Sequence, residues 1–185
     1  MTQWSEHLDD LMRNRYPALL AYARALTAGD LAAAEDVVHD AIVRSFSRSR
    51  RFDSVAHAEA YTRKAIHSVF LDRARSRSRL FRAFSRVAER DRLPSHDESV
   101  TSGALVHGLL AELSPRERAC VLLRFYDDMS LAEVADALGL SVGTVKRYLF
   151  NATEKLGATL GLAEDDGGHA SISVIHPGPR SRKGA

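Results

Sequence analysis

Hydrophobic residues along this chain recur mainly at intervals of three and four positions, the spacing of an amphipathic α-helix. No stretch alternates between apolar and polar residues over a useful length, so no β-strand is predicted. In the first part of the chain, helices are expected over about residues 17–27, 31–46 and 55–75. The second of these has one apolar stripe, formed by Leu31, Ala34, Val38, Ile42 and Phe46. The pattern predicts an all-α fold.

In the second part of the chain, compact structure is expected to resume at about residue 104, and two helix-start signals predict where its helices begin. Ser114 and Glu117 form a capping box with Pro115 at the first helical position, which predicts a helix to about residue 126. Ser130 and Glu133 form a second capping box, which starts a helix that is expected to end near residue 138.

Residues 130–156 have the pattern of a helix-turn-helix, which places its second helix in the major groove of DNA. Gly139 suits the sharp turn between the helices, and Ser141 is expected to cap the second helix. The apolar side is expected to contain Val134, Leu138, Leu140, Val145, Leu149, Ala152 and Leu156. The candidate DNA-contacting residues are Ser141, Val142, Gly143, Thr144, Lys146, Arg147 and Phe150. An ordinary helical hairpin is the alternative, but small Ala135 at the crossing and the basic second helix favour DNA binding.

Composition shifts divide the chain into two small helical domains. Residues 77–103 begin with repeated arginine and serine and are interpreted as a flexible linker, in which a short helix over residues 80–91 remains an open alternative. Residues 163–185 are rich in glycine, proline and charge, which predicts a disordered tail. The predicted domains are therefore residues 1–76 and 104–162.

Several classes of protein do not fit this composition. No apolar run approaches the roughly 20 residues that span a membrane, and the N-terminus lacks the pattern of a secretory signal. Cys120 is the single cysteine, which excludes an intrachain disulfide and a multi-cysteine zinc site, and its apolar neighbours indicate a buried thiol. We expect a cytoplasmic protein with no membrane insertion.

Charge is distributed unevenly along the chain, although the formal net charge is only +2. Residues 1–43 contain 3 basic and 7 acidic residues, whereas residues 44–92 contain 14 basic and 5 acidic residues. Residues 93–185 contain 9 basic and 12 acidic residues. Arginine dominates the middle segment and binds phosphate in a bidentate manner, so this segment is interpreted as a second nucleic-acid contact.

Taken together, these segments resemble a bacterial extracytoplasmic-function (ECF) sigma factor of the sigma-70 family, most closely the actinobacterial groups. Residues 35–46, EDVVHDAIVRSF, are similar to the family helix that binds the RNA polymerase clamp. Residues 59–75, EAYTRKAIHSVFLDRAR, are similar to the helix that reads and opens the −10 element. Residues 113–156 are similar to the domain that reads the −35 element. The resemblance implies a region 2 bundle and a region 4 helix-turn-helix.

The resemblance also implies partners and contact residues. The expected partners are core RNA polymerase, through its beta-prime clamp and beta flap, and promoter DNA, with an anti-sigma factor as one open means of control. The implied polymerase-binding residues are Glu35, Asp36, His39, Asp40 and Arg44. The implied −10 contacts are Arg50, Arg51, Phe52, Tyr61, Arg63, Lys64, His67, Ser68, Leu71 and Asp72. In this interpretation, Phe52 and Tyr61 offer apolar surface to bases that leave the stack.

One residue departs from the family pattern. Many relatives have asparagine where Ser68 stands, and the shorter serine leaves the preferred −10 bases open. The linker fits the resemblance, because the two promoter elements lie about 50 Å apart. Residues 77–103, if extended, reach up to roughly 90 Å.

Two other classes of function fit the sequence less well. A conventional regulator that binds its operator as a dimer needs a dimerisation or ligand-sensing domain, and none is recognisable. An enzyme would have to use the pairs Asp127–Asp128 or Asp165–Asp166, or some of the 8 histidines. Adjacent aspartates in turns are usually solvated, and no phosphate-binding glycine loop or paired-histidine metal motif occurs. We therefore expect neither an enzyme, a cofactor nor a metal site.

Overall fold

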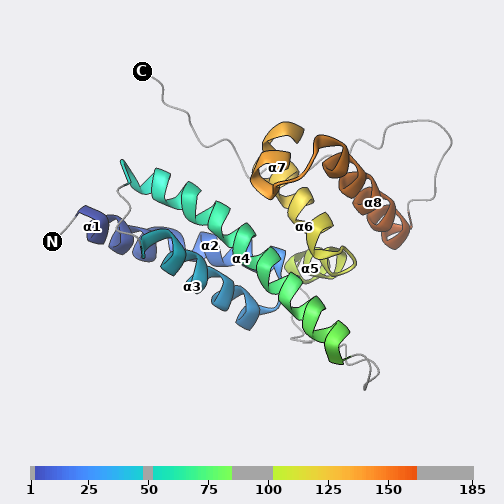
Figure 1. The fold of residues 1–185 in the computed structure, drawn as a ribbon, viewed down its shortest axis with the longest axis horizontal. Coiled ribbons are helices and arrows are strands. Elements are labelled where there is room, and N and C mark those ends of the chain that lie inside the picture. The colour runs from blue at the N-terminus through green and yellow to red at the C-terminus, as the bar shows by residue number, and fades with distance from the viewer. Residues whose placement is uncertain (1–2, 48–51, 85–101, 162–185) are drawn as a thin grey trace.

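The computed structural model describes residues 3–47, 52–84 and 102–161, and all regular structure in these ranges is helical (Figure 1). The first part contains α1 (Gln3–Asp10), the π-helical turn η1 (Leu11–Arg15), α2 (Tyr16–Leu26), α3 (Leu31–Phe46) and α4 (Val55–Phe84). The second part contains α5 (Ser102–Ala111), α6 (Pro115–Val121), the π-helical turn η2 (Leu122–Tyr126), α7 (Leu131–Leu138) and α8 (Val142–Leu160). The predicted all-α class is confirmed.

The first bundle forms because α2, α3 and α4 each present an apolar stripe to the others (Figure 1). The side chain of Asp30 accepts a hydrogen bond from the Ala33 amide at 2.9 Å and so caps the start of α3. The turn before it needs a positive φ, which Gly29 adopts at +93°. The largest fully buried side chains of this bundle are those of Leu11, Leu19, Tyr22, Leu26, Val37, Val38, Phe52, Thr62 and Ile66.

The second bundle follows its predicted capping signals. Both capping boxes are present: the side chains of Ser114 and Ser130 accept hydrogen bonds from the amides of Glu117 and Glu133, whose carboxylates accept in return. Gly139 ends α7 in the left-handed conformation, with φ of +61°. Cys120, Leu123, Val134, Ala135 and Val145 form the buried core between α6, η2, α7 and α8. The predicted helix-turn-helix and the buried thiol are confirmed.

Two features of the first bundle differ from the prediction. α4 continues to Phe84, past the expected end near Arg75, so part of the predicted linker is helical. Neither glycine nor proline interrupts residues 76–84, and Arg75 pairs with Asp72 one turn earlier at 3.2 Å. In addition, α1 and η1 precede the first predicted helix and are held by Leu11, which is fully buried.

The two bundles pack against each other, with α6 and α7 beside α4 and α5 beside α2 (Figure 1). Ala119 of α6 and Leu122 of η2 belong to the same buried cluster as the core of the first bundle. The buried guanidinium of Arg118 donates to the carbonyl oxygen of Leu26 at 2.6 Å, and this contact ties α6 to the end of α2. Residues 85–101 and 162–185 lie outside the described residues, and the whole predicted tail, residues 163–185, falls in the second of these ranges.

None of the helices in the described ranges is long and apolar enough to cross a membrane.

Candidate nucleic-acid and partner interfaces

The N-terminal half of α8 has one exposed face and is held in the core by a buried side chain on its other face. Val145 is fully buried, whereas Lys146 and Arg147, the next two residues, are exposed. Ser141 caps the helix by accepting a hydrogen bond from the Thr144 amide at 3.2 Å. The candidate −35 contacts Ser141, Val142, Gly143, Lys146, Arg147 and Phe150 are all exposed, and Thr144 is half-buried. The structure thus brings the predicted −35 residues together on one accessible surface.

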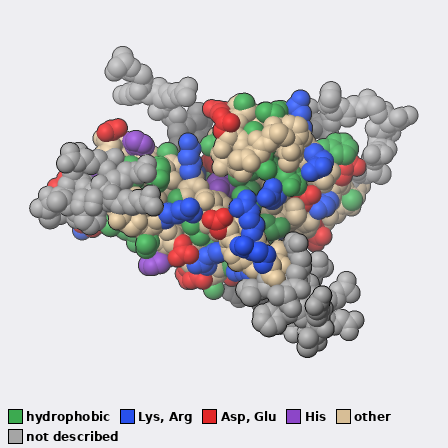
Figure 2. Space-filling view, viewed as in Figure 1, with side chains coloured by type: hydrophobic (Ala, Val, Ile, Leu, Met, Phe, Trp, Pro, Cys, Tyr) green, Lys and Arg blue, Asp and Glu red, His purple; other side chains and the backbone are tan. Residues whose placement is uncertain are grey.

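The polar residues expected to bind polymerase lie together on α3. Glu35, Asp36, His39, Asp40 and Arg44 are all exposed in the structure. Sequence reasoning missed that α4 contacts this surface. Arg73 donates to Asp36 at 3.0 Å and, through Nε, to Asp40 at 3.1 Å. Figure 2 shows basic side chains over the C-terminal half of α4 next to acidic side chains over α3.

Arg44 connects the surface of α3 that is expected to bind polymerase to the candidate −10 helix. Its guanidinium donates to the hydroxyl of Ser68 at 3.1 Å and lies 3.5 Å from a carboxylate oxygen of Asp72. Asp72 is exposed and Ser68 is half-buried, so both are accessible at the side of α4 that faces α3. The two surfaces that the sequence assigns to different partners are therefore continuous.

Three of the candidate −10 residues are buried, which corrects the expectation of an accessible surface. Phe52 is 1% exposed, because its ring packs between those of Phe46 and Tyr61 at centroid distances of 5.1 and 5.7 Å. His67 and Leu71 are also buried within the packed helices. In this structure Phe52 anchors the end of the loop to the core instead of offering a slot to a base. Arg50 and Arg51 lie outside the described residues.

The remaining candidate −10 residues on α4 differ in accessibility. Lys64 is exposed, and Tyr61 is half-buried. Arg63 is half-buried, because its guanidinium donates to Glu59 one turn earlier and to Asp127 of the second bundle, each at 2.9 Å. Arg63 and Lys64 are neighbours in sequence but differ in their contacts. Arg63 forms two ion pairs, whereas Lys64 forms none with the residues that the structure describes.

Asp127 is the centre of a buried polar cluster between the two bundles. Its carboxylate accepts hydrogen bonds from the guanidinium of Arg63 and from the hydroxyl of Tyr22, which also hydrogen-bonds Nε2 of His67. The Asp127 side chain is only 7% exposed, whereas that of Asp128 is 85% exposed. The expectation of a solvated aspartate pair is therefore wrong for Asp127, because three side chains from the other bundle enclose it.

Burial and charge shift the pKa values in this cluster. Burial alone would raise the pKa of Asp127, but the nearby His67 ring and the hydrogen bonds from Tyr22 and Arg63 outweigh it, so this pKa lies below its ordinary value. Burial lowers the pKa of His67 below 6.5, although Asp127 opposes the shift. Burial also raises the pKa of the Tyr22 hydroxyl. The cluster therefore consists of a neutral tyrosine, a neutral histidine, a carboxylate and a guanidinium at neutral pH.

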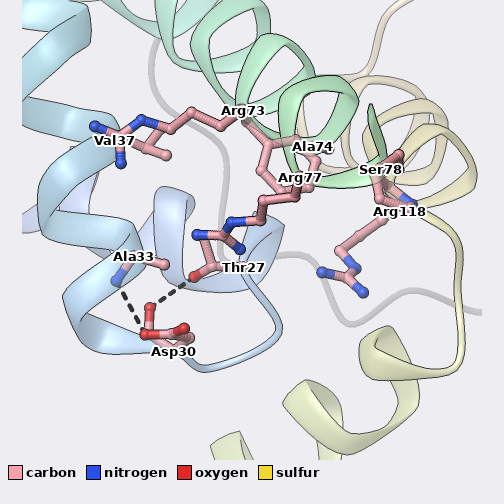
Figure 3. A pocket seen from close by; sticks show the side chains of 11 residues that line it. Thr27, Asp30, Ala33, Val37, Arg73, Ala74, Arg77, Ser78 and Arg118 are labelled. Atoms are coloured by element: carbon pink, nitrogen blue, oxygen red, sulfur yellow. Dashed lines mark hydrogen bonds between the residues drawn. The ribbon is translucent and has the colours of Figure 1, made fainter. Parts of the chain in front are cut away.

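A cavity of about 250 Å³ lies at the same junction, between α3, α4 and α6 (Figure 3). Its wall is formed by Thr27, Asp30, Ala33, Val37, Phe70, Arg73, Ala74, Arg77, Ser78, Pro115 and Arg118. Two of the three arginines have other partners: Arg73 pairs with Asp36 and Asp40, and Arg118 donates to the carbonyls of Leu26, Leu110 and Leu113. Burial lowers the pKa of Arg118 to about 10. No group of three or more potential metal ligands occurs among the described residues.

Comparisons with known proteins match both bundles. Residues 11–80 match the family model described as Sigma-70 region 2, and residues 104–156 match the one described as Sigma-70, region 4. The chain is 31% identical over 148 residues to the RNA polymerase sigma-E factor of Streptomyces coelicolor, which covers 80% of this chain and 82% of that protein. It is 30% identical over 158 residues to the ECF RNA polymerase sigma factor SigL of Mycobacterium tuberculosis, covering 81% and 89%.

A solved structure shares the fold. In the co-crystal structure of the sigma factor RpoE with the anti-sigma factor NepR from Bartonella quintana, the similar chain matches with a TM-score of 0.56 and 23% identity. The match covers 80% of this chain and 92% of that chain. At this level of identity, the likeness supports the arrangement of the helices alone.

Proposed function

Because the chain belongs to the ECF branch of the sigma-70 family, we propose that it binds core RNA polymerase, recognises the −10 and −35 promoter elements and promotes melting of promoter DNA. The observation that carries this proposal is the exposed basic half of α8, held on a capped helix-turn-helix with a separate helical bundle beside it. A helix placed in this way reads base edges in the major groove, and the first bundle supplies the contacts that a simple DNA-binding module lacks.

In this proposal the three surfaces have separate tasks. The acidic side of α3 binds the polymerase clamp, and the exposed face of α8 reads the −35 element while region 4 contacts the beta flap. The side of α4 that carries Lys64, Ser68 and Asp72 lies against the −10 strand. Single-stranded bases can be held by stacking and backbone contacts without any catalytic group, so the function is binding rather than bond chemistry.

The relatives indicate further features of the proposed function. The proposed site of action is the cytoplasm, where promoter DNA and polymerase meet. An anti-sigma factor is a further proposed partner, because the similar sigma factor from Bartonella quintana was crystallised in complex with one.

Transcription in vitro tests this proposal directly. Purified core RNA polymerase is incubated with a genomic DNA library with and without the full chain, and the 5′ ends of the transcripts are mapped. A sigma factor is expected to produce a small set of new start sites preceded by shared −10 and −35 sequences. A protein that binds DNA in footprints but adds no start sites would instead be a conventional regulator.

A further inference from the structure

The side of α4 assigned to the −10 element is in direct contact with the second bundle. Arg63 of α4 donates to Asp127, which follows η2, with 2.9 Å between nitrogen and oxygen. Tyr22 and His67 meet the same carboxylate from the first bundle. Figure 1 shows α6 and α7 lying beside the middle of α4.

The Asp127 carboxylate occupies the guanidinium of Arg63 in the way that a DNA phosphate would. Both groups are anions that accept short, charge-assisted hydrogen bonds from arginine. One guanidinium that already donates to Glu59 and Asp127 has few donors left for a phosphate. Binding of the −10 strand by Arg63 and retention of the Asp127 contact are therefore in competition.

The spacing of the promoter elements also requires the two bundles to separate. The two elements lie about 50 Å apart, so a protein that reads both must hold its two readers well separated. In the structure, a residue of the −10 helix and a residue of the small bundle that contains α8 are joined by an ion pair. This arrangement cannot span both elements, so it has to open before the complete promoter is bound.

We propose that Asp127 is an intramolecular latch, which holds region 4 against α4 and masks Arg63 from promoter DNA until the two bundles separate. The inference rests on the proposed −10 role of α4. The contact that closes the latch is polar: one carboxylate receives a guanidinium and a tyrosine hydroxyl.

The interface between the two bundles suits a contact that opens. The cavity of about 250 Å³ between α3, α4 and α6 shares no residue with the Asp127 cluster, and it leaves another part of this interface incompletely filled (Figure 3). Contacts between domains of one chain are often of this partly polar kind, and relative motion is then expected. Removing the Asp127 carboxylate should shift the balance toward the open form, because the partly buried guanidinium of Arg63 would then keep only Glu59 as a carboxylate partner.

Asp127→Asn in the full chain tests the latch, and Asp128→Asn is a matched control. Both variants remove one negative charge from the same turn, but the Asp128 side chain is 85% exposed and lies 3.8 Å from Arg124. The separation of the bundles is measured by fluorescence energy transfer between dyes on exposed positions of α3 and α8. Binding of a single-stranded −10 oligonucleotide to the free protein is measured in parallel.

We expect Asp127→Asn to increase the separation of the bundles and to strengthen oligonucleotide binding by roughly tenfold, while Asp128→Asn changes neither. Unchanged separation in Asp127→Asn, or an equal change in both variants, would overturn the latch. Larger separation without stronger binding would overturn the masking of Arg63.

Two further measurements keep the outcome interpretable. Tyr22→Phe removes only the hydroxyl that donates to Asp127, so it should separate the two bundles in part. If the Asp127→Asn variant does not fold, Tyr22→Phe takes its place in the test. Transcription by the wild-type chain with core polymerase reports on the proposed function separately. If wild-type transcription starts normally while both latch variants behave as wild type, only the latch is wrong.

Discussion

Arg73 of α4 lies 3.0 Å from a carboxylate oxygen of Asp36 on α3, and the same guanidinium donates to Asp40. The surface proposed for the polymerase clamp is therefore partly occupied by an internal ion pair. Replacing both aspartates by asparagine should weaken binding to core polymerase by roughly 1–3 kcal/mol, because charge-assisted contacts are lost. These exposed pairs contribute only about 0.2–1 kcal/mol each to folding, so stability should change little.

Arg73→Gln separates the two roles of this surface. It removes the internal pair but leaves Asp36 and Asp40 in place. Core affinity, measured by fluorescence anisotropy, should be retained or improved in Arg73→Gln and reduced in the double aspartate variant. Equal losses in both would mean that the ion pair positions α3, and undiminished affinity in the aspartate variant would remove the assignment.

Arg147 and Lys146 should differ in what they contribute at the −35 element. Arg147→Ala is expected to cost about 1–3 kcal/mol and to relax the preference at one base position if the guanidinium forks onto a guanine. Lys146→Ala, if the lysine contacts phosphate only, should weaken all sequences alike and reduce the salt dependence. Binding of holoenzyme to a library of −35 variants measures both effects. Thr159→Ala near the end of α8 is the control, and sequence-independent losses for both basic residues would show that neither reads bases.

Phe52 and Phe150 should separate a structural aromatic from a functional one. Phe52 is buried, so Phe52→Ala should destabilise the first bundle by about 3–5 kcal/mol. Phe150 is 65% exposed, and Phe150→Ala should change stability by no more than about 0.5 kcal/mol. Urea denaturation of the full chain gives both values. A small loss for Phe52→Ala would contradict its role as the anchor of the loop end.

Promoter opening should depend on the accessible residues of α4. We expect Lys64→Ala combined with Ser68→Ala to leave closed complexes largely intact but to reduce open complexes, because these side chains lie at the proposed −10 surface. Permanganate reactivity of unpaired thymines near the start site reports the open fraction. A pre-melted template should rescue the variant, since the cost of unstacking is then already met. Thr159→Ala near the end of α8 is again the control, and failure of the rescue would exclude a role in base capture.

His67 should make the stability of the protein depend on mildly acidic pH. Its pKa is lowered in the folded state by burial, and the groups around it are Tyr22, Arg63 and Asp127. As pH falls below 6.5, the unfolded chain takes up a proton that the folded chain resists, so stability decreases. Asp127, whose folded pKa is also lowered, loses its contribution only below about its ordinary value of 3.8.

The measurement compares urea unfolding at about pH 7.5 and about pH 5.5. Wild type should lose stability between these values, and His67→Gln should lose less. His39→Gln on the exposed side of α3 is the control for a general histidine effect. An equal loss in wild type and His67→Gln would contradict the assignment.

Local signals in the sequence predicted the helix starts well, because a cap depends on residues a few positions apart. Ser114, Ser130 and Gly139 each behave as their neighbours in sequence require. The partners of α4 were not predictable in this way. Arg63 meets Asp127, 64 positions away, and Arg73 meets Asp40, 33 positions away. Helical periodicity indicates which face is apolar, but not which polar residues from another bundle will meet that face.

The same limit explains Phe52. An aromatic residue in a serine-rich, charged loop looks exposed when only its neighbours in sequence are considered. Its partners, Phe46 at the end of α3 and Tyr61 on α4, enclose it from two different helices.

The buried thiol of Cys120 makes region 4 a reporter of its own integrity. Burial raises its pKa to about 11, so at neutral pH only about one molecule in ten thousand carries the reactive thiolate. Alkylating reagents and oxidants should therefore react at this position mainly after α6 has left the core. The rate of alkylation in dilute reagent would measure how often the helix-turn-helix opens locally, with no dye or added cysteine in the chain.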